Sequence, residues 1–153
     1  MIKLERLTEY SDQALKDINS LMRQLVADQV ASGEWQDITK EKLQVALKDS
    51  HSHFFVLKDD ARIVGTATLI LMQRLNSTTA YVEDVVVDET YRGKGLGKRL
   101  IQKLIDESKK LGVRKMQFTS KPERIVANIM YQKMGFVLKK TNVYDMKFKR
   151  FKW

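Results

Sequence analysis

Three glycines alternate with other residues in a basic stretch near the middle of the chain. Residues 92–99 read RGKGLGKR, and the glycines are Gly93, Gly95 and Gly97. Glycine lets backbone N–H groups approach an anion closely, and the interleaved arginines and lysines add positive charge. Because this is more than a tight turn requires, the pattern predicts a loop that binds a phosphate group.

Two carboxylates are candidates for proton transfer. Glu83 and Asp84 stand in an otherwise apolar run, where burial raises the pKa of a carboxyl group toward that of a general base. Side chains alternate along a strand, so we expect the two on opposite faces unless a bulge intervenes. Pairing with a basic residue is the alternative for Glu83.

Cysteine chemistry is excluded, because the sequence contains no cysteine. A thiolate nucleophile, a disulfide and a thiolate metal site therefore cannot form. The two histidines, His51 and His53, lie two residues apart without the partners of a catalytic triad near them, and two alone make a poor metal site. We predict no metal and no cysteine acyl-enzyme.

An excess of basic residues favours anionic partners. Lys and Arg number 28 against 19 Asp and Glu, which gives a formal net charge of +9. Nucleic acid, an anionic membrane and a phosphorylated cofactor are the partners that such a charge favours. The longest uncharged run, residues 63–73, is far shorter than a membrane span, and charged residues begin too early for a signal peptide. We expect a cytoplasmic protein without membrane contact.

The glycine-rich loop joins two elements that the sequence predicts. A β-branched run at residues 82–87 predicts a buried strand before the loop. After it, apolar residues from Leu96 to Ile105 follow the helical period, and Gly112 suits a left-handed C-terminal cap. A P-loop would need Ser or Thr at position 99 and Gly at position 92, and a dinucleotide fingerprint would need Gly at position 98, so neither motif fits.

Along the rest of the chain, the pattern predicts a single domain, residues 1–153, with a mixed α/β sheet. Ser11 and Thr39 suit the N-caps of two helices, Pro122 and Gly135 suit the first turn and the end of another, and Gly65 indicates a bulge or a close backbone approach. We expect a sheet of about seven strands flanked by about four helices. The expected strands are residues 2–7, 53–58, 61–72, 82–87, 113–119, 136–139 and 143–148.

The hexapeptide Arg92-x-x-Gly95-x-Gly97 resembles the acetyl-coenzyme A loop of the GNAT family of N-acetyltransferases. The segment from Asn128 to Phe136 resembles a second signature of that family, although Asn128 could instead bond the local backbone. The expected order of elements is similar to that of the family from end to end, with specific motifs in residues 80–136. The coenzyme-binding residues that the resemblance implies are Val85, Val87, Arg92, Gly93, Lys94, Gly95, Gly97, Lys98, Asn128 and Tyr131.

The resemblance also implies direct transfer of an acetyl group from acetyl-CoA to a primary amine within a ternary complex. Glu83 begins a Glu-Asp-Val-Val-Val stretch that resembles glucosamine-6-phosphate N-acetyltransferases, so it is the expected general base, with a water chain as the alternative. Tyr131 is the implied acid for the departing thiolate, a role that an ordinary phenol pKa of about 10 suits, and packing in the core is the alternative. The N–H group near Val85 would polarise the thioester carbonyl.

The sequence leaves the acetyl acceptor open among a small amine, an amino sugar, an amino acid and a protein amine. Residues 33–38 and 74–79, the expected acceptor segments, show no sugar-phosphate signature. Two other classes of function are alternatives. One is a non-catalytic acyl-CoA-binding regulatory module, and the other is a basic nucleic-acid-binding domain, for which the basic and aromatic tail at residues 147–153 argues. We expect a homodimer, as in similar proteins.

Overall fold

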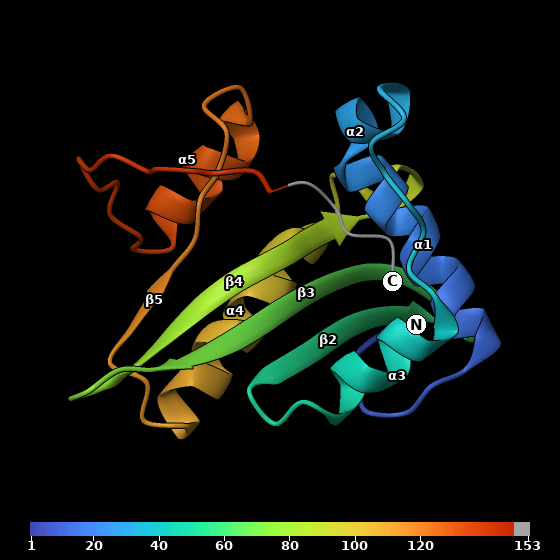
Figure 1. The fold of residues 1–153 in the computed structure, drawn as a ribbon, viewed down its shortest axis with the longest axis horizontal. Coiled ribbons are helices and arrows are strands. Elements are labelled where there is room, and N and C mark those ends of the chain that lie inside the picture. Colours follow the sequence, from blue (N-terminus) through green and yellow to red (C-terminus); the bar gives the residue numbers. More distant parts are fainter. Residues whose placement is uncertain (149–153) are drawn as a thin grey trace. The chain divides into compact units, whose positions relative to one another are not determined.

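Residues 1–119 build a mixed sheet of five strands, ordered β1-β2-β3-β4-β5, in the computed structural model (Figure 1). β1 to β4 are antiparallel neighbours, whereas β4 and β5 run parallel. The structure describes residues 1–148, and the segment from Ser120 on forms a second unit. The strands are β1 (Ile2–Leu7), β2 (Ser52–Asp59), β3 (Arg62–Gln73), β4 (Thr78–Val87) and β5 (Lys115–Gln117).

Helices cover both faces of this sheet. Side chains of α1 and α3 share a buried cluster with β2, β3 and β4, whereas α4 lies behind the sheet in Figure 1. The buried members of that cluster from the sheet are Leu7, Val56, Ile63 and Val86. The helices of the first unit are α1 (Asp12–Leu25), α2 (Ala27–Ala31), α3 (Lys40–Lys48) and α4 (Leu96–Lys110), with a short 3-10 turn, η1 (Glu89–Tyr91).

Local sequence signals determine where α1 and α3 begin. The hydroxyl of Ser11 accepts a hydrogen bond from the Ala14 N–H, and that of Thr39 accepts one from the Lys42 N–H, so both predicted caps are confirmed. Asp17 of α1 is buried as well, which the apolar pattern did not indicate. Its carboxylate accepts a hydrogen bond from the backbone of β3 and thereby fixes α1 to the sheet.

α4 packs its apolar side on the sheet, as its sequence period predicts. Leu100, Ile101 and Leu104 are fully buried. Gly112, just after the helix, has a φ of +68° and supplies the expected left-handed cap. The strand that follows is shorter than expected, since β5 has three residues and pairs with residues 79–81 of β4.

The backbone of β3 makes a close approach at Gly65. A Cβ atom built there would lie 2.9 Å from Cδ1 of Leu57 and 3.3 Å from the carbonyl oxygen of Val86. The pairing of β2 with β3 also shifts register between Leu57 and Lys58. The expectation of a bulge or a close approach at this glycine is therefore confirmed.

The second unit contains one helix, α5 (Ile125–Lys133), within its described residues. A helix between Pro122 and Gly135 is confirmed, but Pro122 precedes the helix instead of lying in its first turn. Gly135, with a φ of +97°, follows the C-cap residue Met134.

The prediction of two strands at residues 136–139 and 143–148 is wrong. No strand occurs after β5 in the described chain, and apolar side chains such as Val137, Tyr144 and Phe148 are exposed there. Alternating apolar residues form a strand only where their N–H and C=O groups pair with a neighbour. The described chain thus has five strands and five α-helices, not about seven and about four. Most of the basic tail, residues 149–153, lies outside the described residues.

Candidate active site

A β-bulge in β4 brings the two candidate carboxylates together. Thr68 of β3 pairs with Glu83, and Thr66 pairs with Val86, so one additional residue of β4 stands between these pairs. Asp84 lies in this bulge with a φ of +56°, a left-handed conformation that Asp tolerates better than most residues. The Thr68 hydroxyl donates a hydrogen bond to Oδ2 of Asp84 at 3.1 Å. The β-bulge that could interrupt the alternation of side chains along this strand is therefore present. Glu83 and Asp84 both lie beside Thr68.

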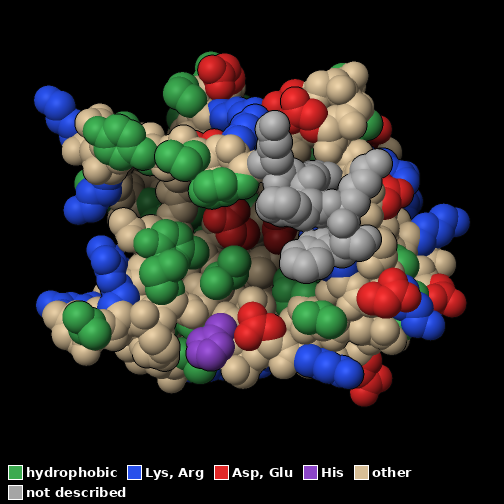
Figure 2. Space-filling model, in the orientation of Figure 1, with side chains coloured by type: hydrophobic (Ala, Val, Ile, Leu, Met, Phe, Trp, Pro, Cys, Tyr) green, Lys and Arg blue, Asp and Glu red, His purple; other side chains and the backbone are tan. Residues whose placement is uncertain are grey.

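The surroundings of these carboxyl groups raise the pKa of each. Loss of hydration raises the pKa of Glu83, and the negative charge of Asp84 raises it further. Burial also raises the pKa of Asp84, although the hydrogen bond from Thr68 opposes this. Figure 2 shows acidic side chains over the middle of the sheet, among hydrophobic ones. Within residues 1–148, no ion pair involves Glu83.

The glycine-rich loop leaves backbone donors available where α4 begins. Gly95 is the N-cap residue, with a φ of +72°, and within the described chain no side chain caps this helix. Cβ atoms built at Gly93, Gly95 and Gly97 would meet no described atom within 4 Å. The N–H groups of the first turn and the positive end of α4 therefore lie at an open surface that fits a phosphate group.

Basic side chains of the loop are exposed beside these donors. Nε of Arg92 donates a hydrogen bond to the carbonyl oxygen of Val87 at 3.1 Å, which leaves its other N–H groups for an anion. Nζ of Lys94 lies 5.0 Å from the centroid of the Tyr91 ring. Lys98 is exposed in the first turn of α4. Three basic residues of the predicted loop, Arg92, Lys94 and Lys98, are thus exposed.

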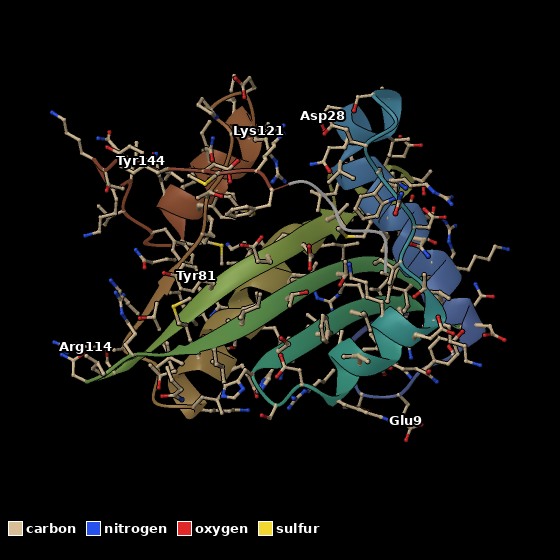
Figure 3. All side chains as sticks on the ribbon, in the orientation of Figure 1. Glu9, Asp28, Tyr81, Arg114, Lys121 and Tyr144 are labelled. Carbon is tan, nitrogen blue, oxygen red and sulfur yellow. The ribbon has the colours of Figure 1, made fainter. Side chains whose placement is uncertain are left out.

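β4 extends well beyond its parallel partner. β5 ends at Gln117, opposite Tyr81, which is labelled in Figure 3. The Tyr81 hydroxyl donates to the side-chain oxygen of Gln117 at 3.3 Å. From residue 82 to Val87, this edge of β4 has no pairing strand among the described residues. An extended ligand with amide groups can pair with such an edge. Val85 and Val87, the predicted contacts for the coenzyme arm, both lie in this part of β4.

Asp88, which the sequence pattern did not single out, joins the end of β4 to the loop. Its carboxylate accepts hydrogen bonds from the N–H and hydroxyl of Thr90, from Arg62 and from Gln24. The Gln24 side-chain oxygen in turn accepts one from the Glu89 N–H at 3.0 Å. Burial acts to raise the pKa of Asp88, but these donors hold the pKa below its ordinary value. The sequence signal for this turn is Asp followed two residues later by Thr.

The second predicted signature lies in α5 of the second unit. Nδ2 of Asn128 donates a hydrogen bond to the carbonyl oxygen of Lys121 at 3.0 Å, which is the local backbone bond considered as the alternative. The ring of Tyr131 meets that of Phe136 edge-on, with centroids 6.3 Å apart. Burial raises the pKa of the Tyr131 phenol and Arg124 lowers it, with a net increase that keeps the phenol protonated at neutral pH. The roles of Asn128 and Tyr131 stay predictions.

Comparison with known proteins identifies the family. Residues 16–136 match the acetyltransferase (GNAT) family. The chain belongs to the GNAT family. A glucosamine 6-phosphate N-acetyltransferase of Trypanosoma brucei brucei is 36% identical over 85 residues, 54% of this chain and 56% of that protein. A probable glucosamine 6-phosphate N-acetyltransferase 2 of Oryza sativa subsp. japonica is 36% identical over 101 residues, 61% of this chain and 58% of the relative. The matches thus span little more than half the length of these relatives.

Solved structures share the GNAT fold of this chain. An acetyltransferase of Trypanosoma brucei has a TM-score of 0.77 at 24% identity and covers 96% of this chain and 100% of its own. The glucosamine-6-phosphate N-acetyltransferase of Arabidopsis thaliana also has a TM-score of 0.77 at 24% identity, over 95% of this chain and 98% of its own. The GNAT family uses acetyl-CoA as its cosubstrate. In the described part of the chain, no helix has the length and apolar character needed to cross a membrane.

Proposed function

We propose that this GNAT chain is an N-acetyltransferase that moves an acetyl group from acetyl-CoA to a primary amine. The observation that carries the proposal is the loop at residues 92–98. Its N–H groups at the start of α4 have no side-chain cap within the described chain, and Gly95 has open space at its Cβ position. A diphosphate is the ligand chemistry that such a loop suits. Relatives named as N-acetyltransferases support the reaction type.

The first unit supplies the proposed binding groups. When bound, acetyl-CoA supplies an acetyl group activated as a thioester. The loop holds the diphosphate through backbone N–H groups and the side chains of Arg92, Lys94 and Lys98. The unpaired edge of β4 at Val85 and Val87 holds the amide-bearing arm, and the N–H near Val85 polarises the thioester carbonyl.

Proton transfer is assigned to two side chains. Glu83 accepts a proton from the ammonium form of the acceptor, directly or through water, because loss of hydration raises its pKa and makes the carboxylate a stronger base. The neutral amine then attacks the thioester carbonyl carbon within the ternary complex, where proximity of the two substrates supplies much of the rate. As the carbon–sulfur bond breaks, Tyr131 donates a proton to the departing thiolate, and the proton that the new amide nitrogen loses restores the phenol. The role of Tyr131 rests on the family resemblance.

The acceptor is a primary amine, and amino sugars are the first class to test because the relatives are named for one. The negative charges of Glu83 and Asp84 on one stretch of β4 favour an acceptor that arrives protonated. A homodimer stays a prediction.

A thiol-release assay with acetyl-CoA tests the proposal. The panel holds amino sugars with and without a 6-phosphate, amino acids, polyamines and lysine peptides, and at least one amine should be acetylated. Glu83→Gln and Tyr131→Phe should each lower kcat by about 100-fold. Tyr144→Phe, which changes an exposed tyrosine of the second unit, is the matched control and should keep the rate.

Three outcomes separate the alternatives. Coenzyme binding without turnover of any amine would favour a non-catalytic acyl-CoA-binding module. Full activity of both variants would refute the acid and base assignments. If calorimetry detects no binding of CoA or acetyl-CoA, the proposed function itself is wrong.

A further inference from the structure

We propose that Asp88 is a positioning residue for the coenzyme loop. Arg62 of β3 and Gln24 of α1 bind its carboxylate, so α1 contributes to coenzyme affinity without touching the coenzyme. The inference rests on the proposed function, because it takes residues 92–98 as the coenzyme loop. Asp88 precedes that loop by four residues and is only 4% exposed. It therefore acts by holding the loop in place.

The two oxygens of the Asp88 carboxylate have different tasks. Oδ1 accepts hydrogen bonds from the Thr90 N–H at 3.0 Å and the Thr90 hydroxyl at 2.6 Å, which fixes the turn η1. Oδ2 accepts from Nη2 of Arg62 at 2.9 Å and from Nε2 of Gln24 at 3.4 Å, which fixes β3 and α1. One buried carboxylate thus ties the entrance of the loop to two elements that are distant in the sequence.

Gln24 also binds the backbone of the turn η1 directly. Its Nε2 donates to Asp88, and its Oε1 accepts from the Glu89 N–H at 3.0 Å, so one amide group spans two consecutive residues. The turn is also held at its other end, because the Tyr91 hydroxyl donates to the carboxylate of Asp59 at 2.8 Å. The backbone that leads into Arg92 is therefore restrained from both sides.

Such restraint matters for binding an anion through backbone N–H groups. A loop that is already ordered loses less conformational freedom when its ligand binds, and its donors stay aligned. Open space lies beside the loop backbone, since Cβ atoms built at Gly93 and Gly95 would touch no described atom within 4 Å. Loss of the Asp88 junction should consequently weaken coenzyme binding more than it weakens the fold.

Calorimetric titration of the 153-residue chain with CoA tests the proposal. Asp88→Asn keeps an acceptor for Thr90 but loses the charge that binds Arg62, and its Kd should rise about tenfold. Gln24→Ala, at a half-buried site in α1, should raise Kd about threefold. Asp17→Asn is the matched control: Asp17 is a buried carboxylate on the same helix, and it holds Ile63 instead of the loop. This control should lower Tm and leave Kd unchanged.

Kinetics and a double variant separate positioning from general destabilisation. With an amine that the panel identifies, KM for acetyl-CoA should rise by the factor seen in Kd, whereas kcat and KM for the amine should change by less than about twofold. The double variant Asp88→Asn/Gln24→Ala should bind CoA about as weakly as Asp88→Asn, because both changes open one junction.

Other results of these titrations would contradict the proposal. Wild-type affinity in both single variants would overturn the proposal, and so would an equal loss of affinity in Asp17→Asn. If Asp88→Asn does not fold, Gln24→Ala decides the question alone, since alanine is a good helix former. A wild-type chain that does not bind CoA would refute the proposed function and this inference together, whereas normal wild-type binding confines any failure to Asp88.

Discussion

Replacing Gly95 by alanine should separate coenzyme binding from the stability of the loop. The φ of Gly95 is +72°, where a residue with a Cβ atom loses about 1–2 kcal/mol. No clash adds to this cost, because the new Cβ would meet no described atom within 4 Å. We expect the free energy of unfolding to fall by about 1–2 kcal/mol. The Kd for CoA should rise by at least about tenfold, since the methyl group enters the space beside the N–H donors.

Gly112→Ala provides a control at the other end of the same helix. Gly112 has a φ of +68°, and a Cβ built there would likewise meet no described atom within 4 Å. Urea unfolding followed by circular dichroism should show a similar loss of stability in both variants, whereas calorimetry should show weaker CoA binding only in Gly95→Ala. The reasoning is refuted if Gly95→Ala loses stability as Gly112→Ala does but binds CoA as tightly as the wild type.

The carboxylate pair and the close contact at Gly65 give two further predictions. Asp84→Asn should raise Tm at neutral pH, because the raised pKa of Asp84 means that its ionisation destabilises the folded state. The protonated carboxyl group stabilises the wild-type fold fully below the ordinary carboxyl pKa, and this stabilisation is lost as pH rises through the raised pKa of Asp84. The Tm values of variant and wild type, measured by thermal melts, should therefore converge in acid. A variant less stable than the wild type at neutral pH would contradict this. In the same variant, carbon-13 NMR should find a lower pKa for Glu83, which loses a negative neighbour. Gly65→Ala should lower the free energy of unfolding by about 1–3 kcal/mol in urea, since its methyl group would lie 2.9 Å from the buried Leu57 side chain; a wild-type value would show that the strand can yield.

Elements that depend on neighbouring residues were predictable from the sequence. The strand, glycine-rich loop and helix at residues 82–111 were expected from a β-branched run, alternating glycines and an apolar helical period, and the structure has all three. The caps at Ser11 and Thr39 were predictable because a cap bonds to an N–H group three residues away. The mixed α/β class followed from the order of these elements, and the resemblance to the family rested on the motifs at residues 92–97 and 128–136.

Features that depend on pairing between distant segments were not predictable. The bulge at Asp84 was only a stated possibility, because its position depends on which residues of β3 lie opposite. The junction at Asp88 joins residues up to 64 apart in the sequence, and the local Asp-x-Thr signal reveals only its contact with Thr90. The strand expected at residues 143–148 failed for a related reason: alternation along the chain indicates a face, but it does not supply a partner.

The bulge in β4 makes the number of residues in this strand as important as their kind. Glu83 and Val86 are three residues apart, yet they stand opposite Thr68 and Thr66, which share one face of β3. Only the additional residue between them allows this, since it shifts the alternation by half a period. Deletion of a single residue here would send either the carboxylate of Glu83 or the buried side chain of Val86 to the opposite side of the sheet. Substitutions at Asp84 should therefore be tolerated far better than its removal.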